Sequence, residues 1–68
     1  NAEKYLRKAV ELMPDDPIVN DHYGDVLWQL NRKMQASYFW KNVLEFEDTD
    51  EEMRKDIYKK LLNGPNKI

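Results

Sequence analysis

Two aspartates and a histidine stand close together in the first half of the chain, at Asp21, His22 and Asp25. Asp21 and Asp25 are four residues apart, so a helix places both carboxylates on one face, where they repel each other. This acidic pair is suited to binding a lysine or arginine of a partner, and the alternative interpretation is an ordinary solvated face. His22 has neither a third metal ligand nor a nucleophile motif beside it, so we assign it no catalytic or metal role.

The residues one helical turn beyond the acidic pair, Trp28 and Gln29, extend this candidate partner-binding surface. Tryptophan is favoured at the energetic centres of interfaces, but packing of Trp28 against a neighbouring helix is the favoured interpretation. Lys55 and Lys59 form a basic step on a later helix and are second candidates, with a solvated, ion-paired surface as the alternative. Trp40 falls within an apolar stripe and is expected in the core.

The composition argues against several classes of function. The 68 residues include 13 acidic and 11 basic ones, which gives a net charge of −2 and a pI of about 5.3. A general nucleic-acid binder has a basic face, so no nucleic-acid partner is expected. No apolar run approaches the roughly 20 residues that span a bilayer, so no membrane partner is expected either. The sequence contains no cysteine, glycine-rich phosphate loop or zinc-ligand spacing, so we expect neither enzymatic activity nor a cofactor.

Apolar residues recur at intervals of three and four along most of the chain, which predicts an all-α protein with four helices. Pro14 ends the first helix, and Asp16 followed by Pro17 is typical of a helix start. Asn31 tolerates the left-handed conformation that often ends a helix, and Thr49 opens a capping-box pattern. The expected helices cover residues 2–13, 17–30, 34–46 and 50–62.

The sequence repeats itself with a period of 34 residues, which is the interval between Ala2 and Ala36. Apolar residues match apolar residues at this offset, as in Leu6 with Trp40. A fixed period in this range indicates stacked helical hairpins. The last helix has a charged back, which is expected of a cap that shields a stack from water. Its apolar stripe comprises Met53, Ile57 and Leu61 with Tyr58 and Leu62, and Met13, Met34 and Met53 are expected to fill gaps in the core.

This pattern resembles the tetratricopeptide repeat, a family of helical hairpins with a degenerate signature of large, small and aromatic residues. The match is carried by Tyr23-Gly24, by the small Ala36 and by the bulky Trp40. The resemblance implies a right-handed stack of antiparallel helical hairpins, an α-solenoid fragment, in which Gly24 and Ala36 let two helices approach closely. The further matching residues are Ala2, Leu6, Ala9, Pro14 and Leu27.

The resemblance also implies the organisation of the chain. Asn20, Asn31 and Asp48 depart from the family signature, which indicates a divergent repeat near the end of an array. The first residue already falls in a helical pattern, so we expect sequence upstream of it. A cytoplasmic location is the default, with the periplasm and secretion left open. The expected parts are the second helix of one repeat (1–14), one complete repeat (17–48), a capping helix (50–62) and a frayed tail (63–68).

Two functions from different classes follow. In the family, the first helix of each hairpin lines a groove that holds partner peptides. The resemblance therefore implies a protein-interaction module that binds a peptide or helix through Asp21, Asp25, Trp28 and Gln29, and secondarily through Lys55 and Lys59. The alternative is a purely structural, self-associating unit, because an unpaired first helix exposes an apolar face. That face would consist of Ala2, Leu6 and Ala9 and would form a homo-oligomer.

Overall fold

The computed structural model describes residues 1–65. These residues form four α-helices and no strand, which confirms the all-α class and the helix count. Each observed boundary lies within one residue of the expected one. The expected frayed tail begins at Asn63, which is still helical, and 66–68 lie outside the described residues. The helices are α1 (Ala2–Leu12), α2 (Pro17–Gln29), α3 (Lys33–Glu45) and α4 (Glu51–Asn63).

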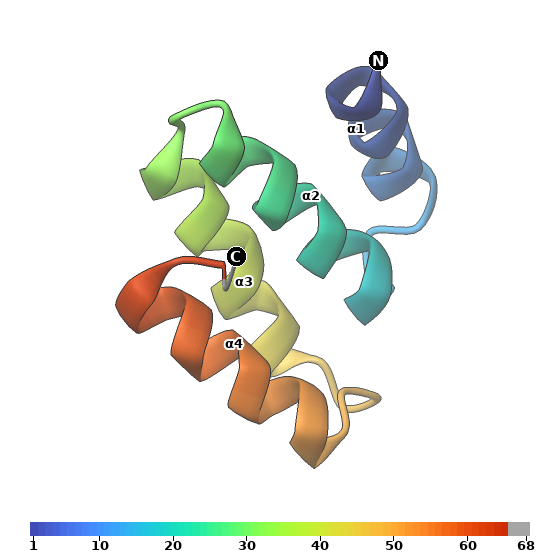
Figure 1. Cartoon of the computed structure of the whole chain (residues 1–68). Helices are drawn as coiled ribbons and strands as arrows, with labels where there is room; N and C mark the ends of the chain where they lie inside the picture. Colours follow the sequence, from blue (N-terminus) through green and yellow to red (C-terminus); the bar gives the residue numbers. More distant parts are fainter. Residues whose placement is uncertain (66–68) are drawn as a thin grey trace.

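The helices lie in chain order, each packed against the one before it (Figure 1). α1 and α4 are the two ends of this row, and α2 and α3 are its centre. The most extensive contact is between α2 and α3. The described part measures 29 × 27 × 20 Å.

Local sequence signals place most of the helix ends. The Asp16 carboxylate accepts hydrogen bonds from the amides of Ile18 and Val19 at 2.9 and 3.1 Å, as expected of an N-cap. Asn31 has a φ of 65°, so its predicted left-handed conformation is confirmed. These two residues fix the start of α2 and the turn into α3.

The predicted capping box at Thr49 is wrong. The Thr49 hydroxyl is buried and donates to the Val43 carbonyl at 2.7 Å, an acceptor in the last turn of α3 that also receives the Phe46 amide at 3.2 Å. Asp50 caps α4 instead, because its carboxylate accepts a hydrogen bond from the Met53 amide at 2.8 Å. Thr49 and Asp50 are both suited to capping the start of α4. Thr49 binds the end of α3 instead, and Asp50 caps α4.

The core is built mainly by α2 and α3. α1 contributes no fully buried residue, although Leu6 and Val10 pack against the edge of the core. The expectation that the methionines fill the core fails for Met34, which is 89% exposed, and for Met13, which is also exposed. Met53 packs against the core as expected. The buried apolar residues are Tyr23, Leu27, Ala36, Trp40, Val43 and Ile57.

The indole of Trp40 explains the glycine at position 24. A Cβ at Gly24 would overlap the Trp40 ring, and its three nearest neighbours are all atoms of that ring. Trp40 is fully buried, and its Nε1 donates to the Asp21 carbonyl at 3.3 Å. Gly24 therefore accommodates a side chain of α3, and its close approach to Ala36 stays a prediction.

Candidate functional site

The acidic pair on α2 is already bound by a cation of the same chain. The Lys60 ammonium on α4 lies 2.7 Å from Asp21 Oδ1 and 2.9 Å from Asp25 Oδ1. It also lies 3.2 Å from the second oxygen of Asp25, and all three side chains are half-buried. The carboxylates expected to hold a partner's lysine or arginine thus hold Lys60, which joins α4 to α2.

The charge on Lys60 is stabilised in this position. Burial lowers the pKa of Lys60, but its hydrogen bonds to Asp21 and Asp25 and their negative charges outweigh this effect and raise it above 10.5. The ammonium also lies 5.8 Å from the ring centroid of Trp40, within the range of a cation–π contact. Lys60 is therefore a protonated link between α2, α3 and α4 at neutral pH.

A groove of about 810 Å³ opens beside this link, between α2 and the carboxyl-terminal half of α4. Its lining carries both signs of charge and a side-chain amide. Lys59 and Asn63 are exposed on α4 one turn apart, and Asp25 keeps one edge accessible. The lining residues are Asp25, Asp56, Lys59, Lys60, Asn63, Gly64 and Pro65.

Trp28 contacts Gly64, one of the residues that line this groove. Its ring centroid lies 5.6 Å from that of Trp40, at 32° between the ring planes. A Cβ at Gly64, whose φ is 80°, would overlap the Trp28 indole. The Lys33 ammonium stands 4.9 Å from the Trp28 ring centroid. The structure thus places Trp28 in packing contact with its own chain, which is the interpretation favoured from the sequence.

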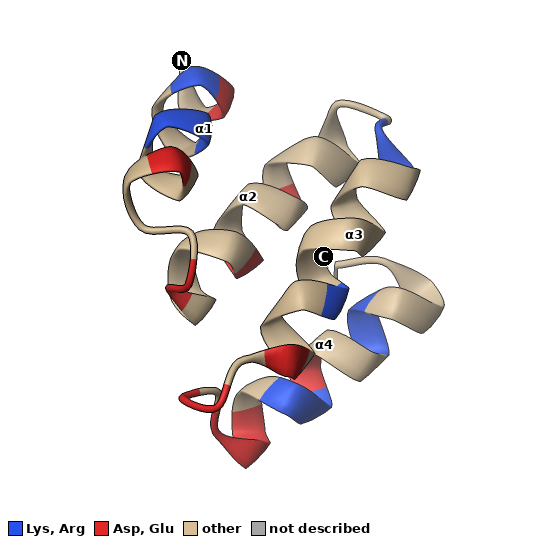
Figure 2. Ribbon diagram, turned by 180° about the vertical axis from the view of Figure 1, so that it is seen from behind, with Lys and Arg blue, Asp and Glu red and all other residues tan. Residues whose placement is uncertain are grey.

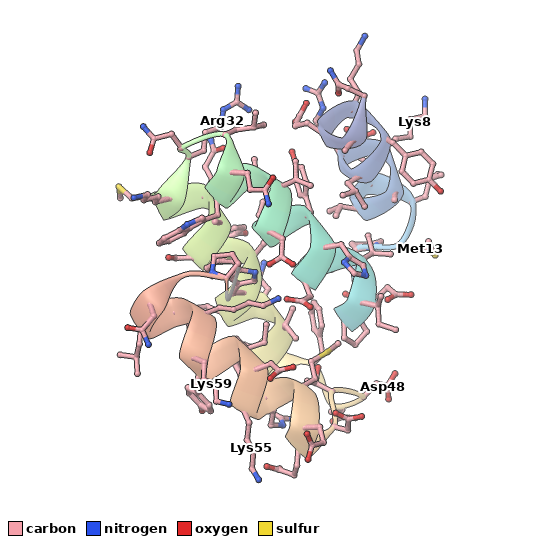
Figure 3. The ribbon with its side chains drawn as sticks, in the orientation of Figure 1. Lys8, Met13, Arg32, Asp48, Lys55 and Lys59 are labelled. Carbon is pink, nitrogen blue, oxygen red and sulfur yellow. The ribbon has the colours of Figure 1, made fainter. Side chains whose placement is uncertain are left out.

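The remaining candidates are dispersed. Gln29 is exposed at the end of α2, outside the groove lining. Lys55 projects away from the body of the molecule, as Figure 3 shows, and does not line the groove either. Of the six residues expected to bind a partner, only Asp25 and Lys59 line the groove.

The charged surface elsewhere is mixed. Acidic residues gather in the loop between α3 and α4 and at the start of α4, while α1 carries both signs (Figure 2). Arg54 lies close to this acidic region, 3.9 Å from Glu51, but its main contacts are with the backbone. Its guanidinium donates to the carbonyls of Leu44 and Phe46 at 2.6 and 3.2 Å, beyond the end of the α3 hydrogen-bond ladder.

The sequence reasoning missed Arg54, although the repeat contains a signal for it. Arg54 is 34 residues after Asn20, which is buried and donates from its amide to the carbonyls of Pro14 and Asp16 at 3.1 and 2.8 Å. Both residues bind backbone carbonyls at or near the loop that precedes their own helix. Residues at the same position of the 34-residue repeat thus have the same structural role, although their side chains differ.

The exposed apolar face of α1 differs from the expected one. Leu6 packs against the core and Ala9 is half-buried, so of the expected face only Ala2 is exposed. The large apolar residues that remain exposed on α1 are Tyr5 at 75% and Leu12 at 74%.

A hydrogen bond joins α1 to α2. The Tyr23 hydroxyl on α2 donates to the Glu3 carboxylate at 3.0 Å. Burial raises the pKa of Tyr23 above 10.0, and this hydrogen bond and the negative charge of Glu3 raise it further. The phenol is therefore neutral at physiological pH and acts as a donor to α1.

Two further observations bound the chemistry of residues 1–65. No three His, Cys, Asp or Glu side chains in this range are grouped as a metal site requires. None of its helices is both long and apolar enough to cross a membrane.

Comparison with protein-family models, with curated proteins and with solved structures finds no match to this chain. The likeness to the tetratricopeptide repeat therefore depends on the residues of the chain itself.

Proposed function

We propose that this chain is a protein-interaction module, the carboxy-terminal part of a tetratricopeptide-type array that binds a partner peptide. In this proposal the four helices belong to a right-handed stack of antiparallel hairpins. The 34-residue period supports it, and so does the equivalent use of Asn20 and Arg54. The observation that carries the proposal is the charged groove between α2 and α4.

The charged groups of the groove that are not already paired determine which groups a partner peptide must carry. Lys60 neutralises much of the acidic pair, so a partner cation at Asp21 would have to displace it. The lining groups outside that ion pair are the cation of Lys59, the carboxylate of Asp56 and the amide of Asn63. An extended peptide fits this set when it carries an acidic group opposite Lys59 and a basic group opposite Asp56.

Lys59 and Lys55 form a matched pair for testing the groove. Both are exposed lysines of α4, one turn apart, but only Lys59 lines the groove. Short peptides selected from a phage-displayed random library on the wild-type chain are then measured against K59E and K55E by calorimetry. We expect K59E to weaken binding about tenfold or more, since it replaces attraction by repulsion, and K55E to change it less than about twofold.

Equal affinity of wild type and K59E for every selected peptide would show that the groove is not the peptide-binding site. The charge reversal Asp25→Lys is a poorer test, because it would set a second ammonium against Lys60 and disturb the link between α2 and α4. The circular dichroism of K59E and K55E provides the check on folding.

The alternative proposal, a structural unit that associates with itself and binds no ligand, is supported by different residues. Tyr5 and Leu12 leave a large apolar area of α1 in contact with water. Neither residue lines the groove, so a substitution at Tyr5 or Leu12 tests self-association without altering the groove.

A further inference from the structure

Large apolar side chains are exposed on both end helices. On α1 these are Tyr5 and Leu12, and on α4 they are Tyr58 at 58% and Leu62 at 83%. The last two were expected to belong to the buried stripe of α4, and the structure corrects this. α1 and α4 lie at opposite ends of the row of helices, so the two apolar faces are separate (Figure 1).

The 34-residue repeat relates the exposed residues of α4 to residues of α2, and those of α1 to residues of α3. Tyr58 and Leu62 are 34 residues after Gly24 and Trp28. Gly24 and Trp28 lie on α2 and contact Trp40 of α3. The residue 34 positions after Tyr5 on α1 is Phe39, through which α3 meets α2.

The contact between α2 and α3 shows how these positions pair. The Trp40 ring covers Gly24 and lies 5.6 Å from Trp28, centroid to centroid. The Phe39 ring meets the Tyr23 ring edge-on at 4.8 Å. Tyr58 and Leu62 on α4 and Tyr5 on α1 therefore stand at positions through which α2 and α3 contact each other.

We propose that a second copy of this chain docks head to tail, with α4 of one copy packed against α1 of the next as α2 packs against α3. The interface continues the one already present, because α4 is the 34-residue repeat of α2 and α1 is the counterpart of α3. The large exposed ring that α4 brings to this contact is Tyr58, at the position of Gly24 in α2. On α1 the exposed ring is Tyr5, at the position of Phe39, because Leu6, at the position of Trp40, packs against its own core.

Because the two faces are different, this contact does not close on itself. Each assembly keeps one free α1 face and one free α4 face after docking, so association continues to trimers and longer rows. A symmetric dimer formed through two α1 faces would behave differently, since it would end at two copies. The two modes can therefore be told apart in solution.

Sedimentation velocity of the 68-residue chain at concentrations up to about 1 mM tests this proposal. We expect the average mass to rise continuously above the 8.2 kDa of one chain. A single species of 8.2 kDa at every concentration would overturn the proposal and would mean that another segment or partner covers these faces.

Charged variants locate the contact. Y5E blocks the α1 face and L62E blocks the α4 face, and each should weaken association about tenfold or more by placing a carboxylate in an apolar contact. M34E is the control, because Met34 is more exposed than either residue and lies on α3, which carries neither face. Circular dichroism verifies that each variant remains helical.

Mixing the two blocked variants gives the decisive result. Y5E keeps a free α4 face and L62E keeps a free α1 face, so their mixture should form a heterodimer of twice the chain mass and nothing larger. Loss of association by Y5E with none by L62E, and no recovery on mixing, would overturn the head-to-tail arrangement in favour of a symmetric α1 contact. Equal loss by M34E would show non-specific association and overturn it as well.

Discussion

α1 and α3 hold equivalent positions in the 34-residue repeat, and their apolar patterns are alike, but they are packed very differently. α3 lies between two helices and buries Ala36, Trp40 and Val43 completely. α1 has one packing neighbour and buries no residue completely. Burial at a repeat position thus depends on the number of neighbouring helices as well as on the residue. α1 should therefore contribute least to stability.

The largest effect is expected from truncating the two equivalent residues Trp40 and Leu6. Trp40→Ala removes a fully buried ring and should cost about 3–5 kcal/mol of unfolding free energy. That is comparable with the whole stability of a domain at ~0.05–0.15 kcal/mol per residue. Leu6→Ala should cost about 1 kcal/mol, because Leu6 is only half-buried. Urea unfolding followed by circular dichroism measures both, and similar losses would contradict the comparison.

An intermediate effect is expected at the link between α4 and α2. Lys60→Ala leaves Asp21 and Asp25 facing each other without a cation, and should lower stability by about 1–2 kcal/mol. The value is below that of a fully buried pair, since Asp25 still meets water. Lys55→Ala, on the exposed side of the same helix, is the control and should stay within about 0.5 kcal/mol of wild type. No difference between the two variants in urea midpoint would show that the ion pair contributes little.

The smallest effect on stability is expected from the hydrogen bond that joins α1 to α2. It can be detected in the pH dependence of the free energy of unfolding. The pKa of Tyr23 is raised above 10.0 in the folded state, so its contribution is complete below pH 10 and is lost as pH rises through the folded pKa. Lys60 behaves in the same way, because its pKa is raised above 10.5. Stability should therefore fall at alkaline pH.

Tyr23→Phe separates the two contributions. The variant lacks the hydroxyl that bonds Glu3, so it should lose less stability than wild type between pH 9 and pH 11 while the Lys60 part remains. Urea midpoints measured across this range test the expectation. Parallel curves for the two proteins would mean that Tyr23 makes no alkaline contribution.

Features determined by neighbouring residues could be predicted from the sequence. Asp16 and Pro17 start α2 and Asn31 turns the chain, because each acts on backbone groups close by. Thr49 shows the limit of this reasoning. Both Thr49 and Asp50 satisfy the local capping rule, and the choice between them depends on a carbonyl of α3.

Features determined by distant residues were harder to predict. The link of Lys60 to Asp21 and Asp25 spans 39 and 35 residues, and no local pattern indicates which lysine of α4 will reach them. The exposed face of α1 differs from the predicted one for a related reason. Helical periodicity gives one apolar stripe, but only the position of α2 decides that Leu6 turns inward and Tyr5 outward.

The equivalent roles of Asn20 and Arg54 bear on how far such a repeat can vary. The loop at residues 13–16 is held by a short amide, whereas the loop at residues 46–50 is one residue longer and is held by a guanidinium. A longer side chain thus reaches across the wider gap. Connector length and the identity of this one residue should drift together among repeats of this kind, so that an insertion in the connector is tolerated where an arginine is present to bridge it.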